Sequence, residues 1–148
     1  MEFRDYYEIE KLINRYAVCA DRGDARGIAE HYARCRLILG GDRVMEVAQM
    51  GKEAFVRWYE AMIRIYPDSR TPKTRRIIST IVIDHDGPGR ARSQCYVVAF
   101  QATPALPLQP IIAGTLYDQF ERVDGQWWIV ERREELELWG DMSHHLLA

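Results

Sequence analysis

The order of hydrophobic patterns along the chain predicts an α+β domain, with its helices first and its strands afterwards. Apolar residues recur at helical spacing in the first part of the sequence, whereas the part after Pro72 alternates as strands do. Segregated helices and strands indicate an α+β fold rather than repeated βαβ units. The 148 residues, 47% of them hydrophobic, fit a single domain over residues 1–148 with a core of ordinary size.

Two short helices are predicted as a hairpin over residues 5–34. The first carries a continuous apolar stripe and ends at Asp21, because Gly23 can adopt the left-handed conformation that closes a helix. Asp24 then offers a side-chain cap for the second helix.

A third helix is predicted over residues 52–66, where a broad aromatic face is closed off by Pro67. Between the helical regions, residues 36–39 and 44–47 read as two short strands about a glycine turn, with a one-sided loop as the alternative.

Four long strands joined by hairpins follow, and they predict an antiparallel meander. A proline-rich segment, residues 102–110, interrupts the pattern and reads as a loop at the rim of the sheet. The helices can cover one face of this sheet, so the other face must meet solvent or another subunit. The strands are predicted at Arg75–Asp84, Ala91–Gln101, Ile111–Val123 and Trp127–Leu138.

Charge and composition narrow the classes of partner. The formal charge of −2, from 20 basic and 22 acidic residues, gives no basic footprint for nucleic acid. The N-terminus is charged from its second residue and no run of 18 apolar residues occurs, which predicts neither a signal peptide nor a membrane span. We therefore expect a cytoplasmic protein that binds a small molecule, whose three cysteines are buried free thiols.

Several stretches resemble one family in their order and spacing. They are RYAVCADRGD at residues 15–24, GTLYD at 114–118 and RVDGQWWI at 122–129. Together they resemble the SnoaL-like family of the nuclear-transport-factor-2-like superfamily. The resemblance implies a cone-shaped roll, in which three N-terminal helices pack on a strongly curved, mostly antiparallel sheet with an internal pocket. The superfamily includes scytalone dehydratase, polyketide cyclases, steroid isomerases, epoxide hydrolases and dioxygenase small subunits, so its fold does not fix a function.

Asp21 and Arg76 are the first candidate site residues. By resemblance to scytalone dehydratase, Asp21 falls on the pocket aspartate that orients a catalytic histidine, and that histidine position is Arg76 here. An arginine would keep the aspartate ionised and could stabilise an oxyanion, but it is a poor general base. The second histidine of that enzyme aligns near Ala99 or Gln101 and is missing too, so dehydration by a histidine pair is not expected.

Asp118 is the second candidate acid. It shares a strand face with Leu116 and Phe120, and an isolated acid between apolar neighbours would have a raised pKa suited to proton transfer. The alternative is that Asp118 pairs with an arginine on the outer face.

Glu131 and Arg132 are competing candidates, since they take opposite faces of the last strand and the sequence does not say which face is inside. The remaining pocket walls are predicted from aromatic and flexible apolar residues, with ordinary core packing as the alternative. These residues are Tyr16, Phe55, Trp58, Met62 and Phe120.

The convex face of the sheet is expected to carry Tyr96, Tyr117 and Trp139, and such an apolar face predicts a homodimer or homotrimer. The four histidines lie at positions 31, 85, 144 and 145, where solvated or structural roles are favoured, and adjacent histidines make a poor metal pair. We therefore expect no metal and no cofactor.

These residues predict a cofactor-independent lyase or isomerase acting on a small hydrophobic cyclic or polyketide-like molecule. In this hypothesis Asp118 moves the proton, Arg76 stabilises oxyanion charge and Asp21 positions Arg76. The alternative is a non-catalytic ligand-binding or assembly protein resembling a dioxygenase small subunit. An Asp-Arg-Asp epoxide-opening site is not favoured, because the segment Arg92-Ser93-Gln94 lacks the acid of that family's Arg-x-Asp spacing.

Overall fold

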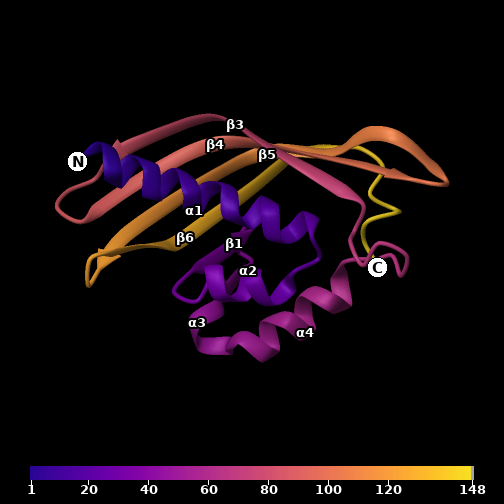
Figure 1. The fold of residues 1–148 in the computed structure, drawn as a ribbon, viewed down its shortest axis with the longest axis horizontal. Helices are drawn as coiled ribbons and strands as arrows, with labels where there is room; N and C mark the ends of the chain where they lie inside the picture. The colour runs from indigo at the N-terminus through magenta and orange to yellow at the C-terminus, as the bar shows by residue number, and fades with distance from the viewer. Residues whose placement is uncertain (148) are drawn as a thin grey trace.

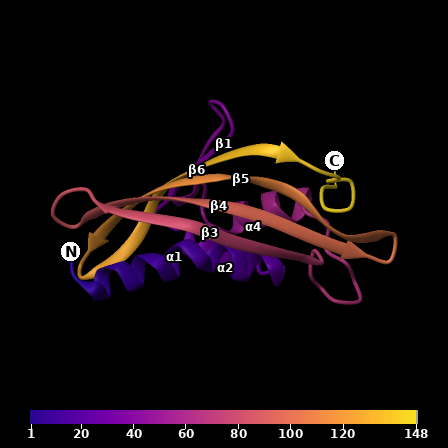
Figure 2. The same cartoon turned by 90° about the horizontal axis from the view of Figure 1, so that it is seen from above.

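The computed structural model describes residues 1–147. Its fold is built on one bent six-stranded sheet. The helices lie along one face of this sheet, while the other face is left open (Figures 1 and 2). The helices are α1 (Phe3–Asp21), α2 (Ala25–His31), α3 (Val47–Met50) and α4 (Lys52–Met62). The strands are β1 (Arg36–Leu39), β2 (Val44–Glu46), β3 (Thr74–His85), β4 (Arg90–Thr103), β5 (Leu106–Val123) and β6 (Gln126–Trp139).

The strand order is β2-β1-β6-β5-β4-β3, and every neighbouring pair is antiparallel except β1 with β6. The meander of four long strands predicted from the sequence is therefore confirmed, as is the α+β class. The main core lies between the helices and the inner face of the sheet. Its largest fully buried apolar members include Ile9, Ile13, Phe55, Leu116, Phe120 and Ile129.

The helix hairpin forms for the local reasons visible in the sequence. Helix α1 buries its apolar stripe and ends at Asp21, and Gly23 follows with φ of 70°. The Asp24 side chain accepts a hydrogen bond from Gly27 N at 2.9 Å and caps α2. Helix α2 is shorter than predicted, since it ends at His31.

Further boundaries also differ from the prediction. The third helix ends at Met62, four residues before the predicted end, and Val47 begins a helical turn rather than ending a strand. The segment at 102–110 is mostly strand, because β4 continues to Thr103 and β5 begins at Leu106. The pairing of β4 with β5 shifts register in this proline-rich segment, because Ala99 is opposite Ile112 whereas Phe100 is opposite Pro110. Such an irregularity lets a strand include proline, which has no N–H to donate.

A β-bulge in β6 decides which residues of that strand face the helices. Gln119 of β5 is opposite Glu131, whereas the next residue, Phe120, is opposite Ile129, so Val130 is an extra residue in β6. The bulge reverses the alternation of side chains, so Ile129 and Arg132 are both buried on the inner face. Glu131 consequently lies on the outer face, where its carboxylate accepts a hydrogen bond from Gln119 Nε2 at 3.1 Å. The prediction of Glu131 as a pocket residue is therefore wrong.

The outer face of the sheet exposes large apolar side chains. Tyr96 and Tyr117 keep 52% and 40% of their surface exposed, as expected for this face. Trp139 is 62% exposed, but it is opposite Ile112, which packs on the inner side with Ala99, so its assignment to the outer face is wrong. Among the helices in residues 1–147, none has the length and hydrophobicity that crossing a membrane would require.

A candidate active site with two arginine–aspartate pairs

Asp21 and Arg76 form the ion pair predicted from the sequence. Arg76 Nη1 donates to Asp21 Oδ1 at 3.0 Å, and the backbone N–H of Arg76 donates to Oδ2 at 2.8 Å. Thr74 Oγ1 adds a third hydrogen bond to Oδ1 at 2.9 Å. Three donors hold this carboxylate at the C-terminal end of α1, where the helix dipole alone would disfavour a negative charge.

Asp118 is paired rather than isolated, which corrects the premise that made it a proton-transfer group. Arg132 donates from Nε and Nη2 to the two Asp118 oxygens, each at 2.7 Å, and both side chains are fully buried. Arg132 Nη1 also donates to Tyr32 Oη at 3.0 Å. Asp118 does share the inner face with Leu116 and Phe120, but its partner comes from that same face, placed there by the β6 bulge.

Tyr16 of α1 connects the two pairs. The guanidinium carbons of Arg76 and Arg132 each lie 5.5 Å from the centroid of its ring, within cation–π distance. Burial raises the pKa of the Tyr16 hydroxyl, although the two arginines oppose the shift. Burial by itself would lower the pKa of both guanidinium groups, but adjacent tyrosines and aspartates raise it overall. Both arginines therefore carry permanent positive charge.

Glu134 adds a third carboxyl group to this layer. It lies two residues beyond Arg132 on β6 and is opposite Leu116 of β5 and Leu39 of β1. Burial raises the pKa of Glu134, against the opposing effects of Arg132 and Arg76. Within residues 1–147 its side chain takes part in no hydrogen bond or ion pair.

Tyr59 of α4 is affected by the same charged groups. The charges that act on its hydroxyl include those of Arg76, Asp21 and Glu134, while burial raises its pKa. Its buried hydroxyl has no hydrogen-bond partner among the described residues. A hydroxyl that is buried without a hydrogen-bond partner costs stability, so Tyr59 is an unusual feature of this layer.

These side chains lie in the layer between the helices and the sheet, where Tyr16, Arg76 and Glu134 are half-buried. Half-buried apolar residues also pack against the core, among them Leu39, Met45, Trp58, Ile78 and Leu136. We call this layer of half-buried polar and apolar residues the recess.

The predicted pocket walls divide into two groups. Tyr16, Trp58 and Met62 are half-buried. Phe55 and Phe120 are each only 1% exposed and pack into the core itself. Phe55 lies in a cluster of rings, with its centroid 5.6 Å from that of Trp58.

The histidines and cysteines are buried to different degrees. His31 is only 5% exposed, and burial, with Arg132 and Arg15 nearby, lowers its pKa to about 3. His85 is exposed at the end of β3, whereas His145 is buried against Arg76. The three cysteines are free and buried. In residues 1–147 no three metal-binding side chains come together.

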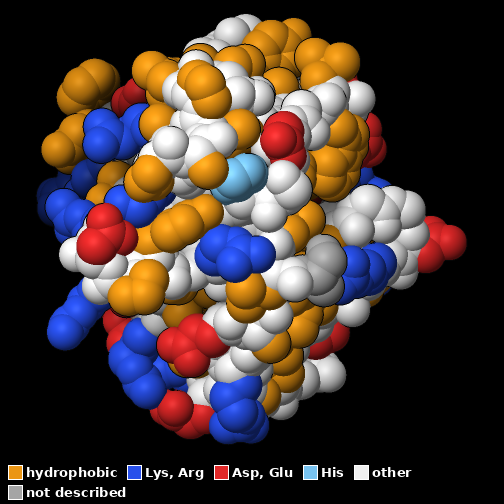
Figure 3. All heavy atoms as spheres, turned by 90° about the vertical axis from the view of Figure 1, so that its right-hand side faces the viewer, with side chains coloured by type: hydrophobic (Ala, Val, Ile, Leu, Met, Phe, Trp, Pro, Cys, Tyr) orange, Lys and Arg blue, Asp and Glu red, His pale blue; other side chains and the backbone are white. Residues whose placement is uncertain are grey.

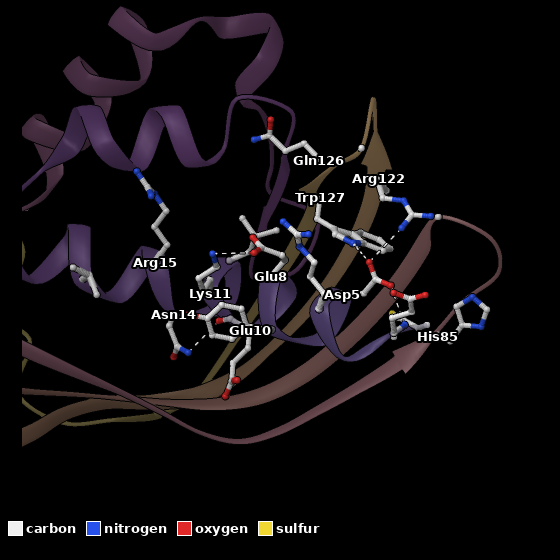
Figure 4. Close-up of a pocket in the computed structure, with 18 of the residues that line it drawn as sticks. Asp5, Glu8, Glu10, Lys11, Asn14, Arg15, His85, Arg122, Gln126 and Trp127 are labelled. Atoms are coloured by element: carbon white, nitrogen blue, oxygen red, sulfur yellow. Dashed lines mark hydrogen bonds and ion pairs between the residues drawn. The ribbon is translucent and has the colours of Figure 1, made fainter.

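A separate open groove of about 1410 Å³ runs along the exposed side of α1 to the tips of the hairpins (Figure 4). Several of its charged side chains already neutralise one another, as in the pairs Lys11 with Glu8 and Arg122 with Asp5. None of the predicted site residues lines it. We therefore place the candidate site in the recess and not in this groove.

A comparison with models of known protein families identifies the family of this chain. Residues 1–133 match the family model of the SnoaL-like domain, so the chain belongs to the SnoaL-like family. A search of curated proteins finds no match.

Solved structures share the fold at low sequence identity. An NTF2-like protein with a cystatin-like fold from Novosphingobium aromaticivorans is 20% identical with a TM-score of 0.72, covering 95% of this chain and 86% of that one. A protein from the same organism assigned as a scytalone dehydratase is 20% identical with a TM-score of 0.71, covering 93% and 87%. The beta subunit of a protein assigned as an aromatic-ring-hydroxylating dioxygenase, from the same organism, is 15% identical with a TM-score of 0.66, covering 94% of each chain. At these identities the likeness establishes the fold alone.

Sequence reasoning missed Glu134 and Tyr59. Glu134 sits in the run ERREELE, where simple alternation leaves the face undecided until the bulge is known. Tyr59 follows Trp58 directly in the third helix, and the aromatic pattern does not decide which of the two faces the core. Its spacing of four residues from Phe55 was the available signal, since both lie on one helix face.

Replacing Arg132 by Met should lower the free energy of unfolding by about 3–5 kcal/mol, because Asp118 would remain buried without its partner. Urea unfolding followed by tryptophan fluorescence measures this change. Arg57→Met, at an exposed position of α4, is the control, with an expected change within about 0.5 kcal/mol. Adding Asp118→Leu to Arg132→Met should recover part of the loss. Equal effects at positions 132 and 57 would contradict the assigned pairing.

Proposed function

We propose that the protein is a cofactor-independent lyase or isomerase that moves a proton on a small hydrophobic cyclic molecule held in the recess. The observation that carries the proposal is Glu134, an inward carboxyl group with a raised pKa and no partner among the described residues. A carboxyl of this kind exchanges protons nearer neutral pH than an ordinary glutamate does. Glu134 therefore takes the proton-transfer role that the sequence suggested for Asp118.

The two arginines supply fixed positive charge beside Glu134. Each is neutralised by an aspartate, and Arg132 is fully buried, so it acts through its charge. Arg76 is half-buried, and its guanidinium keeps N–H donors beyond those that it uses with Asp21, Thr74 and His145. Such prealigned donors can stabilise an oxygen on which negative charge develops during proton transfer. In this proposal Asp21 and Asp118 orient the arginines.

The walls of the recess favour a hydrophobic substrate. Leu39, Trp58 and Leu136 are half-buried and pack against the core, and Leu39 is opposite Glu134 in the sheet. Aromatic and aliphatic walls provide contact area for a flat ring, while the few polar groups fix its orientation. Removing a proton next to a carbonyl, or protonating a leaving hydroxyl, needs no redox partner and suits these residues.

Proton transfer can be tested without knowing the natural substrate. The purified protein is incubated in D₂O with cyclic aromatic ketones, of which α-tetralone is the simplest, and deuterium uptake at the α-carbon is followed by NMR. We expect uptake to be catalysed by the wild-type protein and to fall by about 100-fold or more in Glu134→Gln. Glu135→Gln, one residue away and exposed, is the control. Full uptake by Glu134→Gln would remove Glu134 from the mechanism.

A non-catalytic role is the second candidate function. The exposed apolar side chains of the outer sheet face favour it, because such a face suits assembly with other chains. The same experiment separates the two functions: a protein that binds the ketones but exchanges no α-proton in any of them would support the non-catalytic role.

We also propose that the outer face of the sheet is buried between copies of this chain. Leu138 and Tyr96 there are 69% and 52% exposed. A shallow hollow of about 490 Å³ on the same face carries both signs of charge, with Arg92 and Arg133 beside Glu131 and Glu135. A face with both signs of charge can complement itself across a symmetry axis.

Sedimentation velocity tests this assembly. The wild-type protein should sediment as two or three chains, and Tyr96→Glu combined with Leu138→Glu should sediment as one. Phe3→Glu places the same charge on an exposed apolar residue of α1 and should leave the assembly intact. A wild-type protein that sediments as one chain at micromolar concentration would contradict the proposal.

A further inference from the structure

The segment after β6, residues 140–147, returns across one end of the cone and is held there by its backbone. Arg64 N donates to the carbonyl oxygen of His145 at 2.8 Å, and Leu147 N donates to that of Met62 at 3.0 Å. On the other side, Gln101 Nε2 donates to the carbonyl oxygen of His144 at 3.0 Å. The segment therefore joins the end of α4 to the sheet, beside the start of β3 (Figure 1).

This end of the molecule is covered by hydrophobic side chains interleaved with charged ones (Figure 3). Beneath that surface the His145 side chain is 3% exposed. Its Nε2 lies 3.4 Å from Arg76 Nη2, so the returning segment brings an imidazole into contact with the arginine of the first ion pair.

The contact fixes the tautomer of His145. A guanidinium group can only donate hydrogen bonds, so Nε2 must be the acceptor and Nδ1 must carry the proton. Burial and the charge of Arg76 lower the pKa of His145 to about 4, so the ring is neutral near pH 7. The Nδ1 atom is buried and has no hydrogen-bond partner in residues 1–147.

An N–H group buried without an acceptor is rare in folded proteins, because it forfeits the hydrogen bond it would make to water. The charge of Arg76 also acts on Tyr59 of α4, whose buried hydroxyl is unpaired among the described residues, and on Glu134 of β6. His145 therefore adds an unpaired donor to the polar groups associated with Arg76.

We propose that His145 is a substrate-binding residue of the site, whose Nδ1–H donates a hydrogen bond to a carbonyl or hydroxyl oxygen of the bound molecule. Arg76 holds the ring in the donating tautomer, and the backbone bonds of residues 140–147 hold it in place. The inference rests on the proposed function, and it assigns to this segment a direct part in substrate recognition.

NMR of protein labelled with ¹⁵N-histidine tests the proposal, with α-tetralone as the probe. We expect the free protein to show His145 protonated at Nδ1, and saturating probe to shift that ¹⁵N signal while the signals of the exposed His85 stay in place. Recording the titration in Glu134→Gln as well separates binding from turnover, since the shift should persist where deuterium uptake is lost. Leucine methyl signals of the recess report binding independently.

A His145 signal that does not move while the methyl signals report binding would overturn the proposal, and so would a probe that does not bind. A moving signal in a wild-type protein that exchanges no α-proton would support His145 as a binding residue and refute the lyase or isomerase function.

Activity variants complete the test. His145→Phe keeps a ring but removes the donor and should lower kcat/KM for deuterium uptake about tenfold, mainly through KM. His145→Gln restores an N–H donor and should recover part of that loss. His144→Phe is the matched neighbour and should stay near wild type. Equal losses in all three variants would point to a structural role of the segment and overturn the proposal.

Discussion

The buried pair of Arg132 and Asp118 is the constraint on which the site depends. A guanidinium group with no exposed surface is tolerated only when its charge is matched and its donors are used, and Asp118 and Tyr32 meet that need. The arginine is inside because Val130 is an extra residue in β6. The same bulge then turns Glu134 inward, so one irregularity of the backbone places both the fixed charge and the carboxyl group.

Asp21 and Arg76 form a second arginine–aspartate pair, which connects a helix to a strand. Asp21 is tied to β3 by the Arg76 side chain, the Arg76 backbone and Thr74, which joins the end of α1 to the sheet. Tyr16, slightly more than one helical turn before Asp21, lies against both guanidinium groups. With both aspartates engaged by arginines, Glu134 is left as an inward carboxyl with no ion-pair partner among the described residues.

The arginine at position 76 changes what the site can do. The sequence resemblance places a histidine at this position in scytalone dehydratase, and an arginine there supplies charge but no exchangeable proton near neutral pH. In this chain a neutral imidazole reaches the same arginine from the other end of the sequence, as His145. Proton exchange and hydrogen-bond donation are thereby divided between Glu134 and His145 in the function proposed above.

Local sequence signals predicted the fold well, because they act within a few residues. Gly23 and Asp24 determine how α1 ends and α2 begins, and Asp124 and Gly125 both adopt positive φ in the predicted β5–β6 turn. The face of β6 could not be predicted, since the bulge depends on pairing with β5 rather than on the residues of β6 alone. The Asp21–Arg76 pair was predicted from the resemblance, whereas the partner of Asp118 required knowing that Arg132 is inside.

The central claim is that Glu134 is an inward carboxyl held between apolar residues and two neutralised arginines. The most direct measurement is the titration of its side-chain carboxyl carbon by ¹³C NMR, with the signal assigned from Glu134→Gln. The account predicts that Glu134 titrates at a pH above the ordinary range for glutamate, because burial outweighs the arginines. A Glu134 that titrates within or below that range would contradict the account.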